Sequence, residues 1–381
     1  MNIAMFTDCY TPAKNGVVTS ILQLKEGLEK RSHKVIVVTV GTSQTSSNKP
    51  NIYRFPSIPF NSDIEIHLGR VKLKAVLDIL QKEKIELIHT HTEFTVARAA
   101  KKAAKNLKLP LLHTLHTNFH DYRHYLPFGR FLLPGFMLNV AYKQFLKEYQ
   151  VVICPSEKAE SFIQAINSNK KTFVIANGAD RKRFHPKSAA ENEKQQLKRQ
   201  HGLNPDDKVM LYVGRIAREK RSVALVESLI PLLKVNRTMK LMLVGSGGER
   251  EKVKQIAKEH HLNQQILLNG WVEWEAMPEI YRMADLFVTA SLSEICPMTI
   301  IEAMMSGLPV IARRDKALEG LVQEGKSGCL VDSDHMLEGK ILKLLNKKSL
   351  YLDYSKRALE LSSRFNNSDF AARMEAIYNA V

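Results

Sequence analysis

Short apolar runs alternate with amphipathic stretches along the first half of the chain. In residues 17–30 apolar side chains recur every three or four positions, as in a helix with one buried face. Runs such as residues 35–40 are instead apolar nearly throughout, which is typical of strands in a parallel sheet covered on both faces. The pattern predicts a parallel α/β domain with strands at 3–6, 35–40, 87–90, 111–114 and 151–154 and helices at 17–30 and 70–82.

The same alternation starts afresh in the second half. Asn, Gly and Pro interrupt the chain around residues 176–186, which indicates a hinge. Strands are expected at 209–213, 240–244, 265–268, 286–289 and 310–312, with helices at 222–234, 248–260 and 278–284. We therefore expect two Rossmann-like domains with a cleft between the carboxyl ends of their strands, where ligands bind in folds of this class.

Composition narrows the class of protein. At 381 residues the chain exceeds one ordinary domain, and 44% hydrophobic and 25% charged residues describe a soluble globular protein. No apolar run has the length of a membrane-spanning helix, and the start MNIAMFTDCY resembles a strand more than a signal peptide. Four scattered cysteines predict reduced thiols and no metal site: Cys9, Cys154, Cys296 and Cys329.

The charge is unevenly distributed. The net charge is +17, and residues 1–183 hold 27 Lys and Arg against 14 Asp and Glu. Nucleic acid and anionic membrane surfaces are the usual partners of such a basic half. A surface that is basic only for solubility is the third alternative.

Two glutamates separated by seven residues, Glu294 and Glu302, stand in the stretch SLSEICPMTIIEAMMSGLPVIA. The pattern predicts a strand, a loop with the first carboxylate, and a helix with the second. Carboxylates at such an edge can bind hydroxyls, and the helix N-terminus can bind phosphate. A nucleotide sugar offers both groups. The alternative is a buried loop acid beside a solvated helix acid.

Two further loops carry candidate phosphate contacts. Pro12 and Gly16 interrupt the chain between the first strand and the first helix, where backbone N–H groups can approach a phosphate or form a plain tight turn. Arg215 and Lys220 follow the first strand of the second half. They could neutralise a diphosphate, or they could be solvated loop cations.

Six histidines follow two successive strands of the first half: His89, His91, His113, His116, His120 and His124. No carboxylate pattern completes a metal site, so we interpret them as a polar, partly cationic wall for hydroxyls and phosphate. Residues 125–149 then mix aromatic, aliphatic and basic residues. They fit a buried helix pair and a segment at a lipid interface equally well.

The motifs VGRIAREK, LVGSGGER, NGW, YRMADLFVTAS and SEICPMTIIEAMMSGLPVIA resemble, in this order, the retaining glycosyltransferases of family 4. The resemblance implies the GT-B fold: two facing Rossmann-like domains with an interdomain cleft. It implies a domain at 1–178, a donor-binding domain at 179–364, and a last helix within 365–381 that returns to the first domain. It also implies a nucleotide sugar as substrate, retention of anomeric configuration, no metal and no cofactor.

The resemblance assigns donor contacts to Gly16, Arg215, Lys220, Glu294, Cys296, Met298, Thr299 and Glu302. Glu302 would hold the ribose and Glu294 a hydroxyl of the donor sugar. His116 would lie near the sugar and, with Arg215, Lys220 and Glu294, form the catalytic set. Pro297 departs from the family, because many relatives have glycine there and proline has no N–H to donate.

The segment HTLHTNFHDYRHY resembles the HT-x3-DY-x-HY motif of glycosyltransferases that act on diacylglycerol, with Asp121, Tyr122, His124 and Tyr125 as acceptor residues. The resemblance thus implies transfer of glucose from UDP-glucose to diacylglycerol by a cytoplasmic enzyme attached to the inner face of the cell membrane through anionic lipid. Alternatives are phosphatidylinositol or a polysaccharide on a lipid carrier as acceptor. A nucleic-acid-binding protein is a remote alternative, since the chain has no signature of one.

Overall fold

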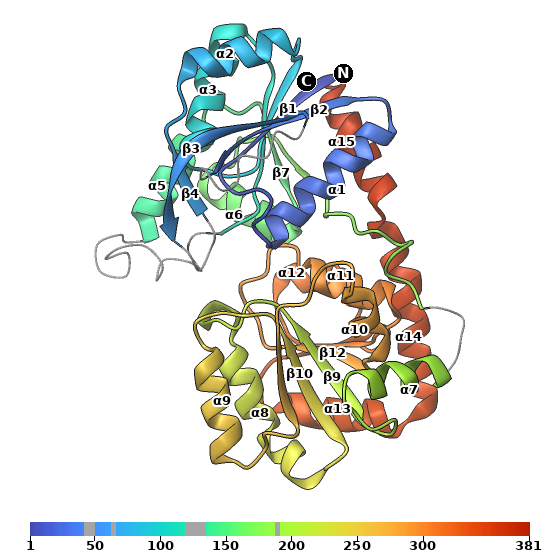
Figure 1. Ribbon diagram of the computed structural model, residues 1–381. Coiled ribbons are helices and arrows are strands. Elements are labelled where there is room, and N and C mark those ends of the chain that lie inside the picture. The colour runs from blue at the N-terminus through green and yellow to red at the C-terminus, as the bar shows by residue number, and fades with distance from the viewer. Residues whose placement is uncertain (42–49, 62–65, 119, 121–134, 187–190) are drawn as a thin grey trace. The chain divides into compact units, whose positions relative to one another are not determined.

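The computed structural model describes residues 1–41, 50–61, 66–118, 120, 135–186 and 191–381. They form two compact units (Figure 1). Unit 1 comprises Met1–Gly178 together with Asn367–Val381, and unit 2 comprises Ala179–Asn366.

Unit 1 is built on an eight-stranded sheet of order β4-β3-β2-β1-β5-β6-β7-β8. All neighbouring strands are parallel except β3 and β4. The strands are β1 Asn2–Thr7, β2 Lys34–Gly41, β3 Ile52–Asn61, β4 Ile66–Gly69, β5 Leu87–Thr90, β6 Leu111–Thr114, β7 Val151–Cys154 and β8 Thr172–Val174. The helices are α1 Gly16–Lys30, α2 Leu73–Lys82, α3 Thr95–Leu107, α5 Gly135–Leu146, α6 Glu157–Ile166 and α15 Asn367–Tyr378.

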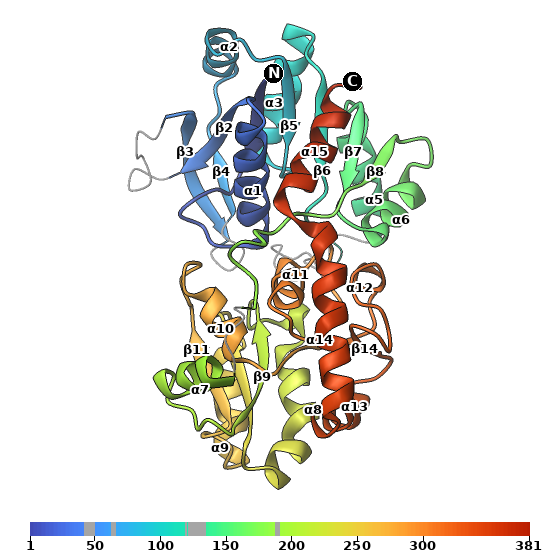
Figure 2. The ribbon, with the colours of Figure 1, turned by 90° about the vertical axis from the view of Figure 1, so that its right-hand side faces the viewer.

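Helices cover both faces of this sheet. The pair α1 and α15 lies on one face, and α2, α3 and α5 lie on the other (Figures 1 and 2). The contact between α1 and α15 is close, since a Cβ at Gly27 would stand 2.6 Å from the Cβ of Ala371. A larger residue than glycine at position 27 would therefore push the two helices apart.

Unit 2 contains a six-stranded, wholly parallel sheet of order β11-β10-β9-β12-β13-β14. Its strands are β9 Lys208–Val213, β10 Met239–Val244, β11 Ile266–Gly270, β12 Leu286–Thr289, β13 Val310–Arg313 and β14 Gly328–Val331. Its helices are α7 Glu191–Gln200, α8 Ser222–Val235, α9 Arg250–Glu259, α10 Met277–Met283, α11 Met298–Met305, α12 Lys316–Glu319, α13 Met336–Asn346 and α14 Lys348–Ser362, with 3-10 turns η3 Arg218–Lys220 and η4 Ser363–Phe365. Helix α8 packs against α9 and α13, while α11 packs against α14.

The predicted fold class is confirmed, because each unit is an α/β domain on a sheet that is parallel except for the β3–β4 pair, and every strand predicted from the sequence is present. Strands β3, β4, β8 and β14 were not predicted. Strand β3 contains Pro56 and Pro59, and proline within an apolar run argues against a strand. The sheet accepts them because β3 lies near its edge, with only the short antiparallel β4 beyond it.

Candidate active site

The loop from β12 to α11 carries the glutamate motif at the carboxyl edge of the unit 2 sheet. Helix α11 begins at Met298, and its N-cap Pro297 makes no side-chain cap. The first N–H groups of a helix have no acceptor within it. Since Pro297 has no N–H, the first amides that this helix end can offer an anion are those of Met298 and Thr299.

Glu302 lies one turn into α11 and is buried, with 6% of its surface exposed. The Tyr281 hydroxyl of α10 donates a hydrogen bond of 2.8 Å to its Oε2 atom. Burial raises the pKa of Glu302 to about 7, although the Tyr281 hydrogen bond opposes this. The alternative of a solvated helix acid is therefore wrong for Glu302.

Glu294 lies in the loop before α11 and pairs with a cation from another loop. Its Oε1 atom is 2.8 Å from Nζ of Lys220, which ends the turn η3 after β9. Both side chains are largely buried. Two residues predicted independently to bind the donor are thus in contact within unit 2.

Arg215, the other predicted cation, is held by a residue that the sequence did not single out. Its guanidinium is 2.7 Å from the buried carboxylate of Glu219. The Ser293 hydroxyl donates a hydrogen bond of 2.9 Å to the Glu219 carbonyl, which joins the β9 loop to the loop of Glu294. Both cations are therefore oriented by carboxylates, and a diphosphate bound here would compete with those carboxylates for them.

Glycines allow the β9 and β10 loops to pass close to each other. Gly245 has φ +133°, and a Cβ there would stand 2.0 Å from the Gly214 carbonyl oxygen. Gly247, with φ +150°, approaches the Ile216 carbonyl in the same way. This close approach explains Gly245 and Gly247 of LVGSGGER and constrains the loop that carries Arg215.

The remaining donor candidates of unit 2 lie in the same loop and helix. Cys296 is a partly exposed cysteine in the loop, and Met298 is buried at the start of α11. Thr299 follows Met298 and is partly exposed. The structure therefore gathers the predicted donor residues of unit 2 at one edge of its sheet.

Gly16 and His116 belong to unit 1. Gly16 begins α1, whose N-cap Asn15 accepts a hydrogen bond from the Val18 amide at 3.1 Å. No heavy atom outside its chain neighbours lies within 4 Å of a Cβ placed at Gly16, so packing within the chain does not require glycine there. Its contact with a phosphate stays a prediction.

His116 follows β6 and pairs with His91, which follows β5. The two rings stack, and Nε2 of His116 lies 3.1 Å from Nδ1 of His91. Burial lowers the pKa of His116 to about 3 and that of His91 well below its usual value. Both imidazoles are therefore neutral at physiological pH.

The predicted cationic histidine wall is wrong for the buried histidines. His89 bonds Tyr378 and Thr114 at 2.7 Å each, and His113 bonds Thr90 at 2.8 Å. Both are fully buried, and burial lowers their pKa, so they are neutral groups of the core. His124 and the predicted acceptor residues Asp121, Tyr122 and Tyr125 lie outside the described residues.

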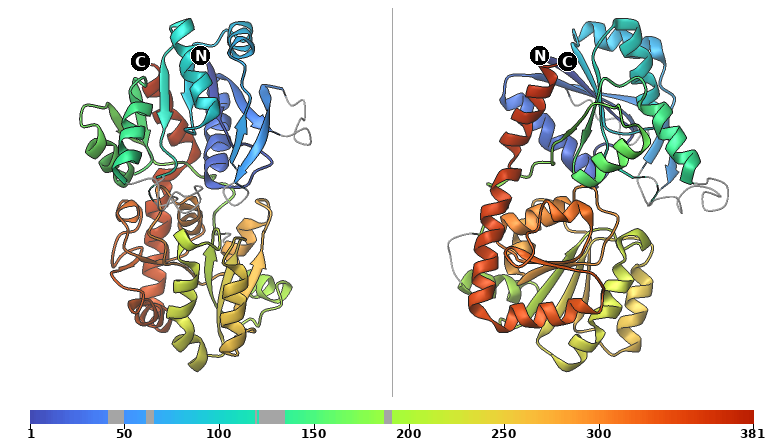
Figure 3. Two further views of the ribbon diagram at one scale, coloured as in Figure 1. Left: turned by 90° about the vertical axis from the view of Figure 1, so that its left-hand side faces the viewer. Right: turned by 180° about the vertical axis from the view of Figure 1, so that it is seen from behind.

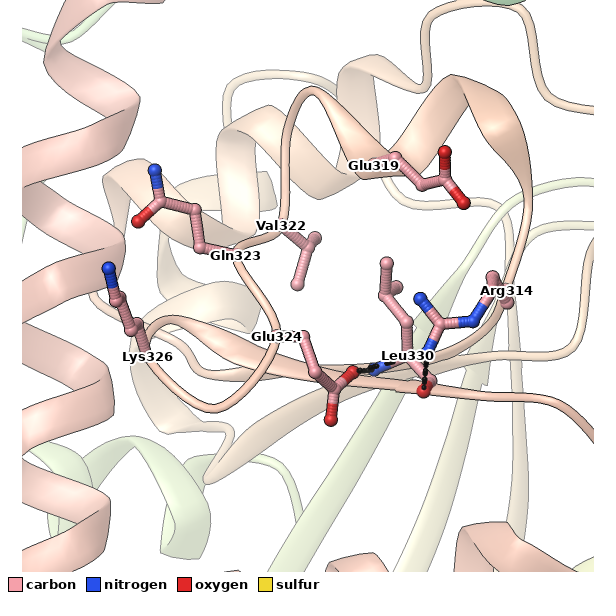
Figure 4. A pocket seen from close by; sticks show the side chains of 7 residues that line it. All are labelled: Arg314, Glu319, Val322, Gln323, Glu324, Lys326 and Leu330. Carbon is pink, nitrogen blue, oxygen red and sulfur yellow. Dashed lines mark hydrogen bonds and ion pairs between the residues drawn. The ribbon is translucent and has the colours of Figure 1, made fainter.

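A separate hollow in unit 2 is lined by Arg314, Glu319, Val322, Gln323, Glu324, Lys326 and Leu330 (Figure 4). Two of its polar groups already have partners: Arg314 pairs with Asp332 at 2.6 Å, and Glu324 accepts a hydrogen bond from the Leu330 amide. None of the predicted donor residues lines it. The candidate donor residues therefore gather at the β9 and β12 loops, away from this hollow.

Comparison with known proteins identifies the family. The model of glycosyltransferase family 4 matches residues 14–183, and the model of glycosyl transferases group 1 matches residues 193–361. An alpha-monoglucosyldiacylglycerol synthase of Streptococcus pneumoniae is 30% identical over 91% of this chain and 78% of its own length. The chain belongs to glycosyltransferase family 4.

A second relative and two solved structures are also similar to this chain. The alpha-monoglucosyldiacylglycerol synthase of Acholeplasma laidlawii is 28% identical over 99% of this chain and 96% of its own length. Among solved structures, HepE of Anabaena with UDP has a TM-score of 0.80 at 18% identity, with full coverage of both chains. Sucrose-phosphate synthase of Thermosynechococcus elongatus has a TM-score of 0.81 at 22% identity, over 100% of this chain and 98% of its own. The last two likenesses confirm the fold of family 4.

Two properties of the described residues bear on the chemistry of this family 4 enzyme. None of their helices is both long and apolar enough to cross a bilayer. No three of their His, Cys, Asp and Glu side chains are grouped so as to hold a metal ion.

Proposed function

We propose that the protein is a retaining hexosyltransferase that moves glucose from UDP-glucose to diacylglycerol. The observation that carries the proposal is the similarity, over 91% and 99% of this chain, to two relatives named alpha-monoglucosyldiacylglycerol synthase. The loops around Lys220 and Glu294 support the donor half, because they combine cations, carboxylates and a helix N-terminus at one sheet edge.

The donor is bound in two parts. Glu302 accepts hydrogen bonds from the ribose hydroxyls, for which a buried carboxylate with one tyrosine partner is suited. Glu294 accepts a hydrogen bond from a hydroxyl of the sugar. Arg215, Lys220 and the amides of Met298 and Thr299 take up the charge of the diphosphate.

The transfer needs one bond broken and one formed. The bond between the anomeric carbon and the diphosphate oxygen breaks, and the acceptor hydroxyl oxygen bonds to the same face of that carbon. The acceptor proton passes to the departing diphosphate. Lys220 and Arg215 lower the barrier by stabilising the negative charge that develops on this leaving group.

Neutral His116 suits a site beside the sugar, since an uncharged imidazole can donate a hydrogen bond without competing for the diphosphate. His91 fixes its Nε2 atom, which leaves Nδ1 to face a ligand. A contact of the Gly16 loop with the diphosphate, and contacts of Asp121, Tyr122, His124 and Tyr125 with the acceptor, complete the proposal.

The acceptor lies in a membrane, so we propose that the enzyme acts at the inner face of the cell membrane and binds anionic lipid there. The excess of Lys and Arg in residues 1–183 supports this partner. Phosphatidylinositol is the second candidate acceptor. It is favoured by a human relative that is named as part of phosphatidylinositol N-acetylglucosaminyltransferase and is 25% identical over 82% of this chain.

The test is a donor screen with purified protein. Labelled UDP-glucose, UDP-galactose, UDP-N-acetylglucosamine and GDP-mannose are each given with diacylglycerol or phosphatidylinositol in anionic vesicles, and the products are separated and their anomeric linkage determined. We expect α-glucosyl diacylglycerol, formed without added metal and in the presence of a chelator. A product on phosphatidylinositol alone would overturn the acceptor, and a β-linkage would overturn retention.

A matched pair of variants tests the donor site. Lys220→Ala should abolish transfer, whereas Lys326→Ala removes an exposed lysine of the hollow in Figure 4 and should leave it unchanged. Equal activity of the two variants would remove Lys220 from the site.

A further inference from the structure

Helix α5 of unit 1 exposes large apolar side chains. Phe136, Met137 and Val140 are 68%, 43% and 63% exposed. Phe136 and Met137 lie four and three positions before Val140, so both neighbour it on the helix surface and the three form one apolar strip. Exposed apolar clusters on a folded protein commonly mark a surface that another molecule covers.

The opposite side of α5 is firmly packed. Tyr142 and Leu146 are buried, and the Tyr142 hydroxyl donates a hydrogen bond of 3.0 Å to the Thr117 carbonyl. The Tyr142 ring also meets Phe162 of α6 edge-on, with centroids 5.1 Å apart. The helix is therefore anchored to unit 1 by one side while the other is presented to the surroundings.

Exposed cations outnumber exposed acids around this strip, although Glu148 just after α5 is also exposed. Helices α3 and α5 contain no Asp or Glu, and their exposed cations are Arg98, Lys102, Lys105 and Lys143, followed by Lys147 just after α5. The two helices lie on the same face of the sheet (Figure 3). The left view of Figure 3 has α3 toward the viewer. Lys101 joins them, since its Nζ lies 3.3 Å from Glu148 and 4.4 Å from the centre of the Phe145 ring.

We propose that the strip of Phe136, Met137 and Val140 enters the interface of an anionic bilayer, while the cations of α3 and α5 bind its headgroups. An aromatic and aliphatic strip on a predominantly cationic pair of helices complements anionic lipid, which offers negative charge above an apolar layer. The assignment of this surface rests on the proposed function, because the same bilayer would hold the diacylglycerol acceptor.

The first test measures binding to vesicles without any sugar donor. Sedimentation compares wild type with Phe136→Ser/Val140→Ser and with Lys143→Gln/Lys147→Gln, on phosphatidylcholine vesicles with and without phosphatidylglycerol. Val235→Ser is the control, because Val235 is 75% exposed but belongs to unit 2. Thermal melts verify that each variant folds.

We expect wild type and Val235→Ser to bind the anionic vesicles alike. The apolar double variant should bind at least about tenfold more weakly, and the lysine double variant roughly tenfold more weakly, with less dependence on salt. Wild-type binding by the apolar variant would overturn the proposal. So would binding of wild type that is equal on neutral and anionic vesicles.

The second test separates docking from catalysis. Short-chain diacylglycerol dispersed in detergent requires no docking, so the apolar double variant should use it as well as wild type does. Loss of that activity in a folded variant would overturn the docking role in favour of a direct role in transfer. If no protein glucosylates diacylglycerol but vesicle binding follows the expected order, the proposed function fails and the docking surface stands.

Discussion

Replacing Glu302 by Gln should stabilise the protein above neutral pH. The folded state raises the pKa of Glu302 from 4.5 to about 7 by burial, so it holds the proton more tightly than the unfolded chain does. Between these two values the unfolded state is the more deprotonated, and the free energy of unfolding falls as pH rises. A shift of about 2.5 units corresponds to about 3 kcal/mol, all of which is lost above pH 7.

The Glu302→Gln variant would have no charge to bury at this position, and the side-chain oxygen of the new amide can still accept the hydrogen bond from Tyr281. The variant and the wild type should therefore be equally stable near pH 4.5. At pH 8 the variant should be more stable by up to about 3 kcal/mol, or roughly 6–12 °C in the Tm of a unit of this size. A residue kept for ligand binding at the expense of stability behaves in this way.

The assay is calorimetric unfolding of both proteins at pH 5 and pH 8, with UDP binding measured in parallel. Tyr281→Phe is the companion variant. Tyr281→Phe removes the hydrogen bond that lowers the pKa of Glu302. This variant should therefore be less stable than wild type at pH 8. A Glu302→Gln protein that is less stable than wild type at pH 8 would refute the reasoning, because it would mean that the folded protein stabilises the carboxylate.

Three further outcomes follow from the same structure. At pH 7, UDP binding should release up to about half a proton, because the ribose hydroxyls favour the ionised form of Glu302. Calorimetry in buffers of different ionisation enthalpy measures this release. No release would argue against a ribose contact. Lys220→Ala should lower kcat by about 10²-fold or more in protein that still unfolds cooperatively, and full turnover would exclude it from the site. Gly245→Ala should cost about 2 kcal/mol or more, measured by denaturant unfolding, because its Cβ would meet the Gly214 carbonyl; unchanged stability would contradict the close loop approach.

The strands of both units could be predicted because they are buried on both faces and consist of nearly continuous apolar runs. Residues 35–40 and 286–289 illustrate this, since burial alone selects their side chains. The short strands β8 and β14 escaped prediction because three or four apolar residues can belong to almost any element.

The residue types of the donor site could also be predicted, but not their partners. Lys220 and Glu294 are 74 positions apart, and the sequence of neither loop predicts their contact. Glu219 lies four positions after Arg215 on the same loop, and this spacing was the available signal for their ion pair. Tyr281 was missed because it acts by contact with Glu302 on another helix. The same holds for Lys198 on the polar helix α7, which is buried and bonds Asp285 at 3.1 Å.

Because unit 1 includes residues 367–381, the ribosome makes all of unit 2 before it makes the last helix of unit 1. That helix supplies Phe370 and Met374 to the core beside α1, and Tyr378 to the buried His89. Until it emerges, the α1 side of the first sheet stays open to water and His89 lacks its hydroxyl partner. Unit 2 can thus fold during synthesis, whereas unit 1 is completed only when α15 joins it.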